Sequence, residues 1–383
     1  MIKLLTIIGA RPQIIKAAAI SRAVQDYFSM QIKEHLLHTG QHYDANMSQV
    51  FFDELGIPKE EYNLHIGSAS HGEQTAKMIE GIEAVLEQQT YDGVLIYGDT
   101  NSTLAGAVAA TKLHIPVFHI EAGLRSYNRA MPEEINRIVA DHLSSVLFAP
   151  TQVAMKNLQQ EGLLDGPAVF RNTKKVQVFY SGDIMYDNSL YFSQLAEEKH
   201  SLMLAKLGIE KNKYILATIH RDNNTDIPER LNNIFQALYH IASEEGYKII
   251  IPLHPRTAKL LHSNLNAALL HSIEQCKNIK IIAPVSYLEM IMLEKHASLL
   301  MTDSGGVQKE AYFFKKPCVI LRSETEWVEI VEHKAGIVAD AITDKIIDAF
   351  HILIKNKISF PPLYGDGNSA KFILSKILAY LKN

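Results

Sequence analysis

Short apolar runs rich in β-branched residues recur along the whole chain, each closed by Gly, Pro, Asp or His before a longer amphipathic segment begins. The runs are continuous rather than alternating, which is typical of strands buried on both faces in a parallel sheet between helix layers. This alternation of strand and helix predicts a doubly wound α/β fold. The predicted strands are Leu4–Ile8, Gly93–Tyr97, Val117–Ile120, Val146–Phe148, Val176–Tyr180, Tyr214–Thr218, Ile249–Pro252, Ile279–Ile282, Leu299–Met301 and Cys318–Leu321.

These strands are too many for one open sheet, and 383 residues suit two domains. We therefore expect two Rossmann-like domains, an N-terminal one over residues 1–172 and a C-terminal one over residues 173–366, because Gly, Pro and Asp break the pattern near residues 165–185. A closing helix over residues 367–383 is expected to join the N-terminal domain. The apolar face of this helix consists of Ile373, Leu374, Ile377, Leu378 and Leu381.

Charge and composition exclude several classes of protein. The net charge is −4 and no block of like charges appears, so we expect neither a nucleic-acid nor a membrane partner. Residues 1–10 are predicted to form a buried strand rather than a secretion signal because Arg11 and Pro12 follow at once, which favours a cytoplasmic protein. The two cysteines, Cys276 and Cys318, are too few for a disulfide framework or a four-thiolate zinc site.

Polar residues follow the predicted strands at their carboxyl ends, where open α/β sheets bind ligands. After the first strand, Gly9 permits a tight turn, Pro12 suits a first helical turn, and Arg11 and Lys16 can address an anion at the helix N-terminus. The alternative is a plain turn with a solvated Arg and Lys. The turn lacks G-x-G-x-x-G, so no dinucleotide cofactor is expected.

Three carboxylates are candidates for general acid and base chemistry. Asp99 follows the second predicted strand, Glu121 ends the third, and Glu133 lies in the first turn of a helix. A carboxylate at the end of a buried strand is costly unless it is paired or used. The alternative for Asp99 is a helix N-cap, and the helix dipole alone explains either Glu133 or Glu134. A metal site is the rival hypothesis, but no His stands at ligand spacing with these acids, so no metal is expected.

The second half of the chain supplies cations and a glycine-rich turn. The cations that follow its strands are His220, Arg221, His254 and Arg322. Ser304, Gly305 and Gly306 stand between a strand and a helix, where backbone N–H groups can approach a phosphate closely. Glu310, one turn further on, can accept from a sugar hydroxyl, and the alternative is an exposed helix acid. No G-x-x-x-x-G-K-[ST] is present, so the pattern favours a nucleotide-sugar enzyme over a kinase.

In this order and over nearly the whole chain, the motifs resemble those of the non-hydrolysing UDP-N-acetylglucosamine 2-epimerases. They are Gly9–Lys16, Thr39–His42, Gly98–Thr100, His119–Arg125, Pro132–Arg137, His220–Arg221, His254–Pro255 and Asp303–Glu310. The resemblance implies the GT-B architecture, in which two Rossmann-like domains face across a cleft. It also implies an isomerase that needs no cofactor, eliminates UDP from a UDP-sugar and adds it back with inverted C2, as a homodimer in bacterial surface polysaccharide synthesis.

The resemblance further implies roles for individual residues. Asp99, Glu121 and Glu133 match the essential carboxylates, and His220 matches a charge-stabilising group near the diphosphate; we take these four as catalytic candidates. The residues implied in substrate binding are Arg11, Lys16, Gln41, His42, Arg137, Arg221, His254, Ser304, Gly305, Gly306, Glu310 and Arg322. Which carboxylate removes the C2 proton stays open.

Departures from the family pattern concern the substrate. Ala10 and Gln13 stand where the commoner turn has Thr and Glu, and Glu73 replaces an Arg tied to allosteric activation by substrate in many bacterial members. The pattern is closer to the branch that acts on UDP-2,3-diacetamido-2,3-dideoxyglucuronate, so both this sugar and UDP-GlcNAc stay open. We expect hyperbolic kinetics, because Glu73 disfavours a second diphosphate. Alternatives from other classes are a GT-B glycosyltransferase and a non-catalytic nucleotide-sugar sensor.

Overall fold

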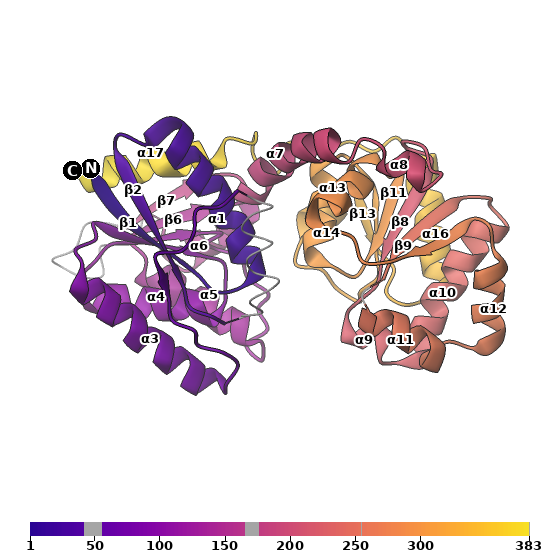
Figure 1. Cartoon of the computed structure of the whole chain (residues 1–383), viewed down its shortest axis with the longest axis horizontal. Helices are drawn as coiled ribbons and strands as arrows, with labels where there is room; N and C mark the ends of the chain where they lie inside the picture. Colours follow the sequence, from indigo (N-terminus) through magenta and orange to yellow (C-terminus); the bar gives the residue numbers. More distant parts are fainter. Residues whose placement is uncertain (42–55, 165–175, 254, 383) are drawn as a thin grey trace. The chain divides into compact units, whose positions relative to one another are not determined.

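The computed structural model describes residues 1–41, 56–164, 176–253 and 255–382. The chain divides into two compact units: a first unit of Met1–Asn188 with Pro362–Asn383, and a second unit of Ser189–Pro361. Each unit contains one parallel sheet with helices packed around it (Figure 1). The expected α/β class with two Rossmann-like sheets is therefore confirmed.

The first unit holds a seven-stranded sheet of order β3-β2-β1-β4-β5-β6-β7. The strands are β1 (Ile2–Ile8), β2 (Ile32–His38), β3 (Tyr62–Asn63), β4 (Gly93–Tyr97), β5 (Val117–Ile120), β6 (Val146–Ala149) and β7 (Gln177–Tyr180). Strand order reverses between β1 and β4, which is the topological switch point where such sheets bind ligands. The turns that follow β1, β4 and β5 carry the candidate acids and cations of the first half of the chain.

Helices surround this sheet. They are α1 (Arg11–Ala23), a π-helical turn η1 (Val24–Phe28), α3 (His71–Gln88), α4 (Asn101–Lys112), α5 (Pro132–Leu143), α6 (Gln152–Gln160) and α17 (Ser369–Lys382). Helix α7 (Ile184–Lys199) begins in this unit and continues into the second. The closing helix α17, yellow in Figure 1, lies beside α1 and buries Ile373, Leu374 and Ile377 completely. The end of the chain is thus an integral part of the first unit.

The division between the units falls after Asn188 and not after residue 172. Strand β7 pairs with β6, so it completes the first sheet instead of opening the second. Two backbone contacts fix the returning chain beside the start of α7: Asp183 N donates to Tyr364 O at 2.9 Å, and Ser369 N donates to Asp187 Oδ1 at 3.1 Å.

The second unit holds a six-stranded sheet of order β10-β9-β8-β11-β12-β13. The strands are β8 (Tyr214–Thr218), β9 (Lys248–Pro252), β10 (Ile279–Ile282), β11 (Leu299–Thr302), β12 (Cys318–Ile320) and β13 (Gly336–Val338). The helices are α8 (Met203–Lys206), α9 (Asp222–Thr225), α10 (Pro228–Ser243), α11 (Pro255–Asn264), α12 (Ala267–Gln275), α13 (Tyr287–His296), α14 (Gly305–Phe313), α15 (Val328–Glu332) and α16 (Thr343–Lys355).

Every strand predicted from an apolar run is present, whereas β2, β3 and β13 were not predicted. Strand β2 is interrupted in sequence by Lys33 and Glu34, of which Lys33 is exposed and Glu34 is half-buried. Strands β3 and β13 are two and three residues long, too short to produce a periodic pattern.

Candidate active site

Glu121 and Lys16 form an ion pair at the carboxyl edge of the first sheet. Each side chain is about 10% exposed, so the alternative of a solvated Lys16 is wrong. Gly98 makes room for the pair: a Cβ there would stand 3.2 Å from Glu121 Oε2 and 3.3 Å from Lys16 Nζ. The Glu121 backbone has φ +71°, a strained conformation for a non-glycine residue of the kind that clusters at functional sites.

Asp99 is held by Arg137 from α5. Arg137 Nη2 lies 2.5 Å from Asp99 Oδ2, and Nη1 lies 3.0 Å from Glu134 Oε2. Burial disfavours the charged guanidinium, but Asp99 and Glu134 outweigh this and raise the pKa of Arg137. The N-cap of α4 is Thr100, so the alternative of Asp99 as that cap is wrong. The structure thus places Arg137, a predicted substrate-binding residue, against two acids.

The two neighbouring acids of α5 have different surroundings. Glu133 is exposed on the first turn, whereas Glu134 is buried. Glu134 accepts hydrogen bonds from Ser126 N at 2.9 Å and Tyr127 N at 2.9 Å. Burial alone raises the pKa of Glu134, but these bonds and Arg137 hold it below its usual value. Glu134 was not predicted as a site residue, although its i,i+3 spacing to Arg137 was a signal for the pairing.

Gln13 closes the turn after β1. Its Oε1 accepts from Gly9 N at 2.9 Å and Ala10 N at 3.1 Å, and its Nε2 donates to Tyr97 O at 2.9 Å. Arg11 is exposed at the start of α1. The predicted residue Gln41 accepts from Ser102 Oγ at 2.8 Å, beside the same turn. His42 and His254, both predicted to bind substrate, lie outside the described residues.

The segment over residues 67–75 connects to the candidate acids through amides. The Asn101 amide donates to Gln74 Oε1 at 2.9 Å and lies 3.2 Å from His71 Nδ1. Asn136 Nδ2 in turn lies 3.2 Å from Asn101 Oδ1 and 2.9 Å from the carbonyl of Asp99. Neither asparagine was predicted, because a single amide in a helix carries no sequence signal of its own.

Glu73, which departs from the family pattern, is an exposed residue in the first turn of α3. It pairs with Lys77 one helical turn later at 2.7 Å. The hydrogen bond and charge of Lys77 lower the pKa of Glu73, so this acid is ionised and partly compensated.

In the second unit, Asp303 fastens the turn that carries His220 and Arg221. Its carboxylate accepts from the backbone N–H groups of both residues at 3.1 Å. Asp303 Oδ1 also lies 3.3 Å from His220 Nδ1. Asp303 is fully buried, while the His220 side chain is about half exposed. The buried Asp303 carboxylate therefore orients the His220 ring, which is itself about half exposed.

The turn Ser304-Gly305-Gly306 opens helix α14 directly after β11. A Cβ at Gly305 or Gly306 would meet no atom closer than 3.5 Å, so a methyl group fits at either position in ordinary van der Waals contact. Trp327 Nε1 donates to Gly305 O at 2.9 Å and fixes the turn. Such a glycine turn at a helix N-terminus presents N–H donors to an anion.

Two other predicted residues of the second unit have surroundings that the sequence left open. Arg322 makes two hydrogen bonds to Glu326, at 2.8 and 3.0 Å. Burial alone would raise the pKa of Glu326, but the hydrogen bonds from Arg322 outweigh this effect and hold the pKa below its usual value. Glu310 is buried, so the alternative of an exposed helix acid is wrong.

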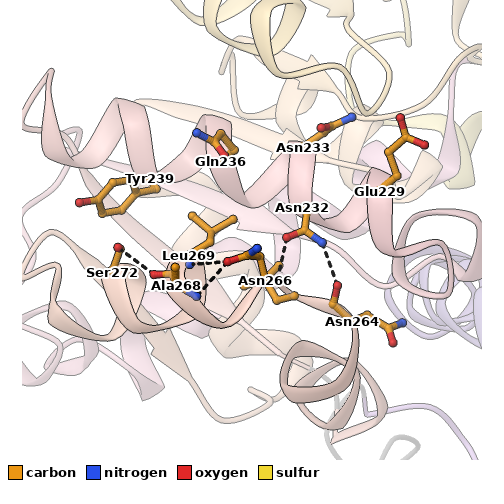
Figure 2. A pocket seen from close by; sticks show the side chains of 11 residues that line it. Glu229, Asn232, Asn233, Gln236, Tyr239, Asn264, Asn266, Ala268, Leu269 and Ser272 are labelled. Carbon is orange, nitrogen blue, oxygen red and sulfur yellow. Dashed lines mark hydrogen bonds between the residues drawn. The ribbon is translucent and has the colours of Figure 1, made fainter.

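A separate polar groove of about 770 Å³ lies on α10, α11 and α12 of the second unit (Figure 2). Its amides serve the local fold: Asn266 accepts from Ala268 N at 2.9 Å as the N-cap of α12, and Asn232 donates to Asn264 O at 2.8 Å. The groove contains no predicted site residue. Within the described parts of the chain, no cluster of His, Cys, Asp or Glu could hold a metal, and no helix is long and apolar enough to span a membrane.

Comparison with known proteins places this chain in one family. The family model for UDP-N-acetylglucosamine 2-epimerase matches residues 28–378. A UDP-N-acetylglucosamine 2-epimerase homolog of Methanococcus maripaludis is 48% identical over 100% of this chain and 99% of its own. The UDP-2,3-diacetamido-2,3-dideoxy-D-glucuronate 2-epimerase of Pseudomonas aeruginosa is 45% identical over 99% of each.

A solved structure agrees with these matches. Methanocaldococcus jannaschii UDP-GlcNAc 2-epimerase, in complex with UDP-GlcNAc and UDP, superposes with a TM-score of 0.81 at 43% identity. The superposition covers 99% of this chain and 100% of that one, which confirms the expected GT-B fold class. From its motifs, its fold and these matches, the chain belongs to the UDP-N-acetylglucosamine 2-epimerase family, a family of isomerases.

Proposed function

We propose that this protein inverts C2 of a UDP-N-acetylhexosamine by eliminating UDP and adding it back. The observation that carries the proposal is the pairing of Glu121 with Lys16 and of Asp99 with Arg137 at one sheet edge. Acids held beside cations at a switch point are suited to proton transfer next to a departing anion.

The chemistry requires a base near C2. The base takes the C2 proton, the C–H electron pair forms a C1=C2 double bond, and the C1–O bond breaks so that UDP leaves with its electron pair. Return of UDP to C1, with a proton delivered to the opposite face of C2, gives the epimer. Two acid–base groups are needed on opposite faces, and Asp99, Glu121 and Glu133 supply the candidates. The elimination and re-addition need no hydride acceptor, and the sequence has neither a dinucleotide fingerprint nor a metal-ligand motif, so we expect activity without added NAD and after EDTA treatment.

Residues of the second unit are proposed to bind the nucleotide. The glycine turn of Ser304, Gly305 and Gly306 at the start of α14 suits the diphosphate, and Glu310 suits a ribose hydroxyl. His220, with its ring half exposed and its turn fixed by Asp303, is suited to stabilise charge on the leaving diphosphate. We further propose a cytoplasmic homodimer that supplies its product to surface polysaccharide synthesis.

A second substrate is UDP-2,3-diacetamido-2,3-dideoxyglucuronate. The Pseudomonas aeruginosa relative carries that name, and the segment over residues 67–75 is hydrogen-bonded through Asn101 and Asn136 to the Asp99 turn. We therefore propose that substituents at C3 or C6 of the sugar bind near His71.

The test is a comparison of kcat/KM for both UDP-sugars, with the epimer identified by NMR. The proposal expects epimerisation of at least one of them. Turnover that releases UDP only when a sugar acceptor is added would favour a glycosyltransferase and refute the proposal. A His71→Ala variant should change the ratio of the two kcat/KM values, whereas the exposed control His262→Ala should leave the ratio unchanged.

A further inference from the structure

His119 lies on β5 two residues before Glu121, and its ring is fully buried. Its neighbours across the sheet are the apolar residues Ile96 on β4 and Leu147 on β6. Both ring nitrogens nevertheless have polar partners. Nε2 lies 2.8 Å from the carbonyl oxygen of Gly98, and Nδ1 lies 2.7 Å from Asp141 Oδ1.

These partners determine where the ring hydrogens are. A carbonyl oxygen can only accept, so Nε2 of His119 carries a hydrogen. Asp141 is surrounded by further donors, since its Oδ2 accepts from Gly123 N at 3.0 Å and pairs with Arg125 at 2.8 Å. Burial alone would raise the pKa of Asp141, but the hydrogen bonds and charges of His119 and Arg125 outweigh this effect and hold the pKa below its usual value. An ionised Asp141 also only accepts, so Nδ1 carries a hydrogen too.

The ring connects the two turns that carry the candidate acids. Gly98 donates its N–H to Ile120 O at 3.0 Å, and its carbonyl accepts from His119. The two peptide groups that flank Gly98, just before Asp99, are therefore both bonded to β5. Asp141 holds Gly123 N, two residues beyond Glu121. A chain of buried polar contacts therefore runs from the Asp99 turn to the Glu121 turn.

We propose that His119, held as an imidazolium by Asp141, is a positioning residue that fixes Asp99 and Glu121 relative to each other. Its effect on catalysis rests on the epimerase function proposed above, whereas its charge state does not. A neutral ring would lose one of the two contacts, because a single hydrogen cannot serve both the Gly98 carbonyl and the Asp141 carboxylate. The link between the two turns would then be broken.

The charge state is measured by ¹⁵N NMR of the full-length enzyme, labelled at its 17 histidines. Both His119 ring nitrogens should resonate as protonated nitrogens at neutral pH, and their signals should be absent in a His119→Gln variant. In Asp141→Asn, whose side chain can no longer act as an anion, one of them should move to the unprotonated position. A His119 ring with one unprotonated nitrogen in the wild type would overturn the inference, whatever the activity.

The positioning role is measured by kinetics. His119→Gln and Asp141→Asn should each lower kcat by roughly a hundredfold, the loss typical of a misplaced reacting group, with KM little changed. The exposed His262→Gln variant is the matched control. Urea denaturation reports whether the first unit of each variant is folded. UDP affinity, which we propose depends on the second unit, should be retained.

If His119→Gln retains kcat within a few-fold while the fold is intact, the positioning role is wrong. If His119→Gln does not fold, Asp141→Asn decides the same question. A wild-type enzyme that epimerises neither sugar would refute the proposed function instead, and the NMR result would stand independently.

Discussion

The two units hold their candidate residues in different ways. In the first, the charged groups are paired with one another, as in Glu121 with Lys16 and Asp99 with Arg137. In the second, Arg322 pairs with Glu326, but the turn that carries His220 and Arg221 is held by backbone N–H groups that donate to the buried Asp303. Glycines form the turn before α14. Proton transfer needs acids whose protonation is set by neighbours, whereas phosphate binding needs N–H donors and close backbone approach. This difference agrees with our proposal that the first unit transfers protons and the second unit binds the nucleotide.

The largest effects should come from the acids of the first unit. Asp99→Asn, Glu121→Gln and Glu133→Gln each remove a candidate acid–base group, so kcat should fall by roughly 10²–10⁴-fold. UDP affinity should change little, because the proposed diphosphate site belongs to the second unit. The measurements are steady-state kinetics and calorimetric titration with UDP.

The matched control is Glu87→Gln, an exposed acid on α3. If all three site variants behave like this control, the assignment of acid–base chemistry to the first unit is wrong. A large loss of UDP affinity would instead contradict the division between the units.

The half-buried acid Glu34 of the first unit extends the comparison to stability. Burial raises the pKa of Glu34 from 4.5 to about 7, although hydrogen bonds from Ser21 and Thr6 oppose the shift. The folded chain therefore holds this proton more tightly than the unfolded chain. The free energy of unfolding should fall by about 3 kcal/mol as pH rises through this interval. Glu34→Gln should remove that part of the pH dependence in urea denaturation.

Identical pH dependence in wild type and Glu34→Gln would contradict this assignment. The second unit buries a comparable acid, Glu294, whose pKa burial raises well above its usual value. Because the two acids belong to different units, a Glu34 substitution should change the transition of the first unit alone if the units unfold separately.

The glycine turn of the second unit should give an intermediate effect. A methyl group at Gly305 or Gly306 meets no atom closer than 3.5 Å, so Gly305→Ala and Gly306→Ala should fold normally. Each methyl would occupy space beside the proposed phosphate, and UDP affinity should fall about tenfold, which corresponds to ~1.4 kcal/mol. Gly72→Ala, at an open position of the first unit, is the control. Unchanged affinity in both turn variants would place the diphosphate elsewhere.

The smallest effect concerns regulation. Wild-type saturation curves should be hyperbolic without a lag. Glu73→Gln should leave kcat within a few-fold, because Glu73 is exposed and pairs with the exposed Lys77. Initial rates over a wide range of substrate concentration measure this. Sigmoidal saturation with activation by substrate would refute the expectation.

Sequence patterns predicted those strands whose burial on both faces requires a continuous apolar run. Every strand with a continuous apolar run was found, because strands buried on both faces must be apolar throughout. Strand β2 was missed because Lys33 and Glu34 interrupt its apolar run. The domain boundary was placed too early because β7 pairs with β6 of the first sheet, although a long segment of the chain separates these two strands.

The candidate site was predictable at strand ends and less so elsewhere. Asp99 and Glu121 stand just after strands, Lys16 lies in the helix that follows β1, and the structure brings them to one edge. The pairing of Arg137 with Asp99, or of Asp141 with His119, joins residues 38 and 22 positions apart, which no local pattern encodes. Contacts of this kind form only when the tertiary structure brings distant segments of the chain together.

The most direct test of the account is epimerisation of UDP-GlcNAc or its 2,3-diacetamido uronate analogue in D₂O, followed by NMR at C2. Elimination and re-addition require the C2 proton to leave and a solvent-derived one to be delivered to the opposite face. The account predicts that wild type forms an epimer that carries deuterium at C2 from the first turnovers. Asp99→Asn, Glu121→Gln and Glu133→Gln should form this product roughly 10²–10⁴-fold more slowly. An epimer that retains its original C2 hydrogen would contradict the account.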